Sequence, residues 1–238
     1  MRFFKGDLHI HTCLSPCADL EMSPKNIIEE AKLKGLEILA ICDHNSMENT
    51  EPAMELGKEN NILVLPGMEV TTEEEVHILG IFENLEKALP FQNIIYENLP
   101  DLQEERFLEE QPVVDREENV LSFCKKSLFY AVNLKIEEIV EKIHQFGGLA
   151  IASHIDREAF SIIGQLGFIP EGLKLDGLEV VFDLKKEYEF YNLPLIRSSD
   201  SHFLEEIGQR KTEFYLGSLN FEEITLAFKN KEGRFLKI

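Results

Sequence analysis

The sequence has few basic residues and no long apolar run, and each absence excludes a class of protein. Lysine and arginine total 24 against 44 acidic residues, so the 238-residue chain carries a formal net charge of −20. This charge excludes a broad basic face for nucleic acid or anionic membrane. No apolar run approaches the roughly 20 residues that a membrane-spanning helix needs. The first residues lack the apolar stretch of a secretory signal, so none is expected.

Cysteine is also scarce. The four residues are Cys13, Cys17, Cys42 and Cys124, and their spacing suggests no disulfide framework. Cys42 lies inside an apolar run and is expected to be a small buried hydrophobic residue. We therefore expect a reducing, cytoplasmic compartment.

Short apolar runs recur along the chain, and each is followed by a polar or turn-rich loop. Valine, isoleucine and leucine dominate most runs with little alternation, which is typical of strands buried on both faces of a parallel sheet. The expected strands cover residues 3–11, 36–43, 62–69, 76–82, 148–154, 177–182 and 193–198, with 213–217 as an eighth strand or an edge.

Helical stretches lie between many of these strands. Ser23 is placed to cap a helix that ends at Gly35, and a second helix is expected over 136–146. Asn220 and Glu223 resemble a capping box that opens a last helix. This alternation favours an α/β fold, and about seven repeats favour a barrel over an open sheet.

One acidic segment interrupts the alternation. Residues 97–118 carry nine acidic residues and two arginines, together with two prolines. We expect a solvated, partly helical insertion between the fourth and fifth strands. The chain is otherwise expected to form a single domain over 1–238, because an α/β barrel can use that length.

Histidines gather at the ends of the expected strands. Only His144 of the seven lies on an expected helix, where we expect it to be structural. His77 opens its strand, whereas the other five end theirs; these are His9, His11, His44, His154 and His202. The carboxyl ends of parallel strands meet on one face, where α/β proteins build their sites. Residues two apart in a strand share a side, so His9 and His11 present both imidazoles together.

Carboxylates are placed to complete a metal site. Glu69 ends an apolar strand, where one carboxylate can bridge two cations, and Asp200 precedes His202 by two residues. Asp43 adjoins His44, and Asp7 precedes His9 by two; both are candidates to orient a ligating imidazole. No G-x-S-x-G motif occurs, which argues against a serine hydrolase. Neutral imidazoles and carboxylates suit Zn, Mn or Fe.

The order of these motifs resembles the PHP superfamily, named for the polymerase and histidinol phosphatase domain. DLHIHT is followed by DHNS, GMEV, a strand histidine, ASHID and a late D-x-H, from Asp7 to His202. The resemblance is greatest to small stand-alone bacterial metal-dependent phosphoesterases. It implies a distorted (β/α)7 TIM-like barrel with two or three divalent metal ions at its C-terminal face.

The resemblance also assigns the candidate ligands to metal positions. The first is formed by His9, His11, Glu69 and Asp200. Glu69 bridges to the second, which is formed with His77 and His154. The third is formed by His44 and His202, with Cys17 as a further ligand and Asp19 as its alternative. A thiolate ligand would favour zinc.

Such a site implies hydrolysis of a phosphoester by a metal-activated water. Arg157 and Arg197 lie near the expected site face and are candidates to bind phosphate oxygens. We predict a small phosphorylated metabolite or nucleotide as substrate. The alternatives are a nuclease or phosphodiesterase acting on oligonucleotides, a non-catalytic metal-bound regulatory module, and hydrolysis of C–N bonds.

Overall fold

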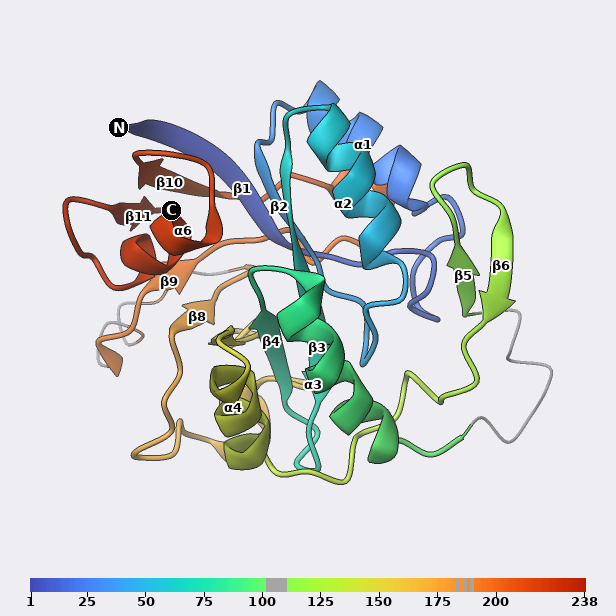
Figure 1. Cartoon of the computed structure of the whole chain (residues 1–238). Helices are drawn as coiled ribbons and strands as arrows, with labels where there is room; N and C mark the ends of the chain where they lie inside the picture. The colour runs from blue at the N-terminus through green and yellow to red at the C-terminus, as the bar shows by residue number, and fades with distance from the viewer. Residues whose placement is uncertain (102–110, 183–184, 186–187, 189–190) are drawn as a thin grey trace.

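A nearly closed sheet forms the centre of the computed structural model, which describes residues 1–101, 111–182, 185, 188 and 191–238 (Figure 1). Its strands are β1 (Arg2–Ile10), β2 (Ile38–Ile41), β3 (Leu63–Thr71), β4 (His77–Ile81), β7 (Leu149–Ala152), β8 (Gly177–Glu179), β9 (Leu195–Ile196), β10 (Thr212–Leu216) and β11 (Phe235–Lys237). Their order is β11-β10-β1-β2-β3-β4-β7-β8-β9. The two end strands, β11 and β9, lie against each other, which confirms the expected TIM-like barrel.

The direction of the strands differs from the expected parallel sheet. Strand pairs β1–β2, β2–β3, β7–β8 and β8–β9 are parallel. Pairs β1–β10, β10–β11, β3–β4 and β4–β7 are antiparallel. The segment between β3 and β4 is too short for the crossover that a parallel pair needs, so β4 must turn back on β3. The sheet is therefore mixed, and the expectation of parallel strands holds for half of these pairs.

Helices lie around the outside of the sheet (Figure 1). They are α1 (Pro24–Leu33), α2 (Thr50–Glu59), α3 (Leu85–Glu97), α4 (Ile136–Gln145), α5 (Ile162–Leu166) and α6 (Phe221–Phe228), with a 3-10 turn η3 (Leu204–Glu206). The predicted caps at Ser23 and Asn220 are confirmed. Ser23 Oγ accepts the Asn26 N–H at 3.1 Å, and Asn220 Oδ1 accepts the Glu223 N–H at 2.9 Å.

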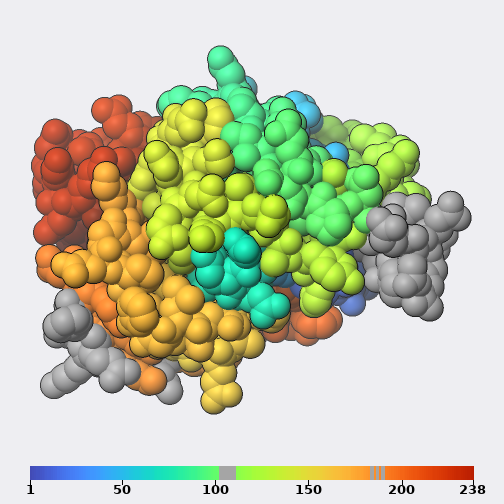
Figure 2. All heavy atoms as spheres, turned by 90° about the horizontal axis from the view of Figure 1, so that it is seen from below, coloured from blue at the N-terminus to red at the C-terminus, as the bar shows by residue number. Residues whose placement is uncertain are grey.

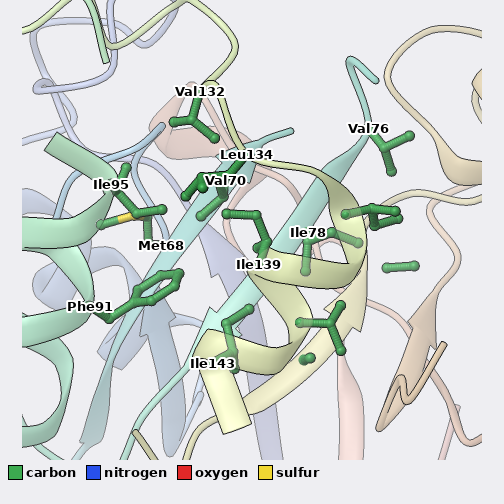
Figure 3. Close-up of a cluster of buried hydrophobic side chains, with 14 of the residues drawn as sticks. Met68, Val70, Val76, Ile78, Phe91, Ile95, Val132, Leu134, Ile139 and Ile143 are labelled. Atoms are coloured by element: carbon green, nitrogen blue, oxygen red, sulfur yellow. The ribbon is translucent and has the colours of Figure 1, made fainter. Parts of the chain in front are cut away.

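The outer surface of β3 and β4 packs against α3 and α4 (Figure 3). The side chains that meet there are Met68, Val70 and Ile78 from the strands and Phe91, Ile95, Ile139 and Ile143 from the helices. Cys42 is fully buried in a second cluster with Leu8 and Leu65, as its apolar run predicts. This packing makes β3 and β4 a fixed base for the polar residues at their ends.

The acidic segment over 97–118 is in part a hairpin. Strand β5 (Pro112–Val114) pairs with β6 (Val120–Phe123) at the right of Figure 1. Residues 102–110 of the expected, partly helical insertion lie outside the described residues. Asn49 joins this hairpin to the barrel, because its side chain accepts the Val114 N–H at 2.9 Å and donates to the Pro112 carbonyl at 3.1 Å. The same amide donates to Thr12 Oγ1 at 3.1 Å. The hairpin is thus tied to the chain that follows β1.

Every helix in the described part of the chain is too short or too polar to cross a membrane.

We expect Asn49→Ala to lower the free energy of unfolding by about 2–3 kcal/mol, because it leaves the Val114 N–H and the Pro112 carbonyl without their buried partner. Asn60→Ala is the matched control, since Asn60 lies at the partly exposed end of α2 and should cost less than about 1 kcal/mol. Urea denaturation measures both. Equal losses in the two variants would contradict the anchoring role of Asn49.

Candidate metal centre

The carboxylate of Glu69 lies at the centre of a buried group of imidazoles. Glu69 is 1% exposed and projects from β3. Its Oε1 lies 3.0–3.3 Å from the nearest ring nitrogens of three histidines, which are His9, His77 and His154. Its Oε2 lies 3.4 Å from His11 Nε2 and 3.2 Å from His44 Nδ1. Both oxygens of one carboxylate therefore face imidazoles, which is the geometry that a bridging ligand requires.

Asp200 and His202 complete the cluster from the segment after β9. Asp200 Oδ1 lies 3.3 Å from Nε2 of both His9 and His11, and these two nitrogens are 3.1 Å apart. The His202 ring stacks on His11 with centroids 4.2 Å apart. The structure thus brings together residues from nearly the whole length of the chain.

Within the described residues, the ligand atoms form three overlapping groups, in each of which all atoms lie within 4.8 Å of one another. The groups are His9–His11–Glu69–Asp200, His44–Glu69–His77 and His11–His44–His202. The first coincides with the first metal position implied by the resemblance. The other two group the histidines differently, because His44 joins Glu69 and His77, and His11 joins His44 and His202. His154 still contacts the same Glu69 oxygen as His77.

The reversed direction of β4 explains why His77 opens its strand. The first residue of an antiparallel strand lies at the edge where its neighbours β3 and β7 meet the site, so His77 pairs with Thr71 at the end of β3. Two other site residues have left-handed backbone conformations, His154 with φ +28° and Asp200 with φ +52°. Such conformations cost energy and persist where the surrounding structure enforces them, often at functional sites.

Divalent cations fit this donor set. The His77 Nδ1 atom is buried 3.0 Å from Glu69 Oε1 but makes no hydrogen bond, and His154 Nδ1 is likewise buried without a partner. A nitrogen so close to a carboxylate without hydrogen-bond geometry is suited to sharing a cation with it. Burial lowers the pKa of His77 and, more strongly, of His44, which favours the neutral rings that metals need. Burial alone would raise the pKa of Glu69, but His77 and His9 hold it well below its usual range.

Glu179 is the residue that the sequence analysis missed. It is fully buried in β8, and its Oε2 lies 2.9 Å from His9 Nδ1 and accepts the His154 N–H at 3.0 Å. It therefore orients His9 from behind, leaving Nε2 to face Glu69 and Asp200. The available signal was a single acidic residue inside the apolar run GLEVV.

Asp43 reaches a candidate ligand through Ser15. Asp43 Oδ1 accepts the Ser15 hydroxyl at 2.7 Å, and Ser15 Oγ lies 2.9 Å from His11 Nδ1. The carboxylate also accepts the Thr12 N–H and hydroxyl, each at 2.7 Å. This network holds the His11 ring with Nε2 toward Asp200 and Glu69.

Asp7 acts on the backbone instead of on an imidazole. Its two oxygens accept the N–H groups of Ser199 at 2.9 Å and Gly208 at 2.8 Å, which fixes the segment that carries Asp200. Burial raises the pKa of Asp7 to about 6. The β1–β2 register shifts between Asp7 and Ile10, so strict alternation of sides does not hold along this part of the strand.

A small cavity of about 180 Å³ opens onto the cluster. Cys17 lines it, together with four of the histidines and two carboxylates, but lies outside the three groups of ligand atoms. Asp19 does not line the cavity, and its carboxylate accepts the Glu21 N–H at 2.8 Å. Of the two alternatives for a further ligand, Cys17 is therefore the better placed.

The two predicted arginines are placed differently. Arg157 lines the cavity, and its Nη2 lies 2.5 Å from Asp200 Oδ2. Arg197 does not line the cavity, and its Nη2 donates to the carbonyls of Val181 at 3.2 Å and Phe182 at 3.1 Å. Only Arg157 is within reach of a ligand in the cavity.

Comparison with known proteins identifies the family. The model of the PHP domain matches residues 7–169, and a PHP-associated model matches residues 185–232. An uncharacterized protein of Methanocaldococcus jannaschii is 31% identical over 184 residues, which cover 74% of this chain and 80% of that protein. A 5′-3′ exoribonuclease of Haemophilus influenzae is 32% identical over 108 residues, 44% of this chain and 38% of the enzyme.

A similar fold is found in the lesion-specific endonuclease Q of Pyrococcus furiosus. That structure has a TM-score of 0.76 and 22% identity, and the match covers 99% of this chain and 58% of the endonuclease. The chain therefore spans little more than half the length of this relative, and well under half of the exoribonuclease. The chain belongs to the PHP family. The exoribonuclease and the endonuclease to which it is similar are both hydrolases of phosphoester bonds.

We expect Glu179→Gln to weaken binding of Mn²⁺ or Zn²⁺ by about 10- to 100-fold. A neutral amide holds the His9 ring less firmly than a carboxylate does, and it makes the imidazole a weaker electron donor to a metal ion. Glu213→Gln is the control, since Glu213 pairs with Lys237 away from the cluster. Isothermal titration of metal-stripped protein measures the affinities. Wild-type affinity in Glu179→Gln would contradict the orienting role.

Proposed function

We propose that this chain hydrolyses a phosphoester of a small metabolite or a nucleotide, using two or three divalent ions such as zinc, manganese or iron. The observation that carries the proposal is the Glu69 carboxylate, whose two oxygens face five imidazoles between them. Asp200 adds a second buried carboxylate to two of these imidazoles. This is the donor set of a multinuclear hydrolytic site.

The proposed ligands are the residues of the resemblance. They are His9, His11, His44, Glu69, His77, His154, Asp200 and His202, with Cys17 at the cavity wall. Bound divalent ions would polarise the phosphoryl group and lower the pKa of bound water. Glu179 and Asp43 position the imidazoles, and the burial of the cluster strengthens each electrostatic contact within it.

Arg157 supplies the protein's own positive charge at the cavity. Its guanidinium pairs with Asp200 Oδ2 and can exchange this contact for one with a phosphate oxygen. The guanidinium suits this role because its N–H groups can donate two parallel hydrogen bonds to a phosphate. It is the one lysine or arginine among the described residues that line the cavity. A single cation in a cavity of about 180 Å³ fits one phosphoryl group better than a run of phosphates.

Oligonucleotides are the second candidate substrate. One likeness over 99% of the chain is to an endonuclease, and a related structure is a complex of endonuclease Q with a 27-mer duplex that has an abasic lesion at the active site. The net charge of −20 disfavours a long electrostatic track for such a polymer. We therefore place the small substrate first. The cytoplasm remains the proposed location, on the basis of the four unpaired cysteines.

A substrate panel tests the proposal directly. Metal-stripped protein reloaded with Mn²⁺, Zn²⁺ or Fe²⁺ is expected to release phosphate from small phosphomonoesters and nucleoside monophosphates, and Glu69→Gln should lower kcat by at least about 10³-fold because it loses the shared carboxylate. Phosphate release and metal content are measured on the same samples.

A length series of 5′-phosphorylated single strands and an abasic duplex completes the panel. If kcat/KM rises steadily with strand length, the nuclease is the better description. If no phosphoester is cleaved with any metal, and metal removal unfolds the protein, the chain is a metal-bound module without turnover.

We expect Arg157→Ala to raise KM for a phosphomonoester by about 10- to 100-fold with a smaller change in kcat, because a charge-assisted contact to phosphate contributes about 1.5–3 kcal/mol. Arg197→Ala should leave KM within about twofold and lower the thermal stability, since Arg197 binds two backbone carbonyls. Steady-state kinetics and thermal melts separate these effects. The proposed roles would be reversed if Arg197→Ala raised KM and Arg157→Ala did not.

A further inference from the structure

Two exposed phenylalanines stand at the cavity that holds the candidate metal centre. Phe129 is 62% exposed and Phe160 is 38% exposed, and both line the cavity. Phe129 precedes α4, and Phe160 lies between β7 and α5. In Figure 2, the chain ahead of α4 (yellow-green) and the chain after β7 (golden) flank the teal turn that joins β3 to β4. Neither ring is needed to fill the core.

Both rings contact candidate metal ligands. Phe160 stacks on His77 with centroids 4.7 Å apart and an interplanar angle of 18°. Phe129 meets His44 edge-on, with centroids 6.4 Å apart. The His44 and His77 rings are themselves 5.2 Å apart. The phenylalanines therefore flank a pair of imidazoles at the metal centre, and each keeps part of its surface open to the solvent.

The backbone holds each phenylalanine in place. Phe160 has a φ of +58°, which is rare for a bulky residue, and its carbonyl accepts the His77 N–H at 2.8 Å. On the other side, Asn45 donates to the carbonyls of Leu128 at 2.8 Å and Tyr130 at 3.0 Å, the two neighbours of Phe129. Both exposed rings therefore project from backbone that hydrogen bonds hold in place. The energetic cost of the left-handed backbone conformation at Phe160 indicates that the position of its ring matters.

We infer that Phe129 and Phe160 form a stacking surface for the nucleobase of the substrate, while the phosphate lies beside Arg157. This inference rests on the proposed function and narrows its substrate class to nucleoside phosphates. Aromatic side chains stack on any base, because every base has a flat π-face. The sugar of a nucleotide separates base and phosphate, so one molecule can reach both the rings and Arg157. An aliphatic phosphoester would leave both rings uncovered.

The test compares two ligands that differ only in the base. Binding of adenosine 5′-monophosphate and of ribose 5-phosphate to Mn²⁺-loaded protein is measured by isothermal titration. We expect wild-type protein to bind the nucleotide at least about tenfold more tightly, as one stacked base would give. The double variant Phe129→Ala/Phe160→Ala should reduce this ratio to less than about threefold.

Three further variants guard against a structural effect. Phe129→Ala alone removes a largely exposed ring and should lower the ratio without changing the melting temperature, whereas Phe129→Tyr should retain the ratio. Phe168→Ala is the matched control, because Phe168 is 59% exposed and does not line the cavity. It should bind both ligands as wild type does.

Equal wild-type affinities, failure to bind either ligand, or an unchanged ratio in the double variant would each overturn the inference. Phosphate release from the same two ligands is recorded in parallel. Base-selective binding without cleavage of either ligand would count against the proposed function and leave the stacking surface standing. Cleavage of both ligands at equal efficiency, with equal binding, would support the proposed function and overturn the stacking surface.

Discussion

One buried carboxylate determines the character of the site. A glutamate with so little exposure is stable as an anion only when positive charge or strong donors surround it. Glu69 has five imidazoles for this purpose, and the carboxylates in turn act on the rings. Burial alone would lower the pKa of His9, but Glu179, Glu69 and Asp200 hold it well above its usual range. The cluster therefore attracts positive charge, and protons and metal ions compete for the same nitrogens.

The same cluster bears on how an acidic protein would act on the proposed anionic substrate. The net charge of −20 is a property of the whole chain, whereas the cluster inside the barrel gathers imidazoles and carboxylates that could hold divalent ions. Arg157, paired to Asp200, adds the one guanidinium at the cavity among the described residues. In the proposed function, affinity for phosphate is thus concentrated at one point. The rest of the molecule repels polyanions, which favours a compact ligand over a long one.

Much of the fold and of the candidate site could be predicted from the sequence, because the signals were local. Apolar runs marked the strands of the barrel, and histidines at their ends marked one face. The direction of β4 was missed because an apolar run does not show which way its strand runs in the sheet. The segment between β3 and His77 is nevertheless too short for a crossover. The hairpin of β5 and β6 was missed because acidic residues around it obscure the alternation of a strand.

Glu179 could not be predicted in the same way. Its partner His9 lies 170 residues away in the sequence, and only the closure of the sheet brings the two together. Asp7 shows the same limit, since its carboxylate contacts the backbone of Ser199 across 192 residues instead of the neighbouring imidazole. Local patterns can indicate which side chains reach the site. Which of them support the others depends on tertiary contacts.

The antiparallel pairing of β3 and β4 also has a consequence for the order of folding. Glu69 and His77 lie on one hairpin, so their contact requires closure of only a short loop, and such local contacts form early. Asp200 and His202 meet His9 and His11 only when the two ends of the barrel come together, which is the slow, non-local step. A nascent chain would therefore hold only part of the donor set. Full metal loading is expected to follow closure of the barrel, so a bound metal centre reports a completed fold.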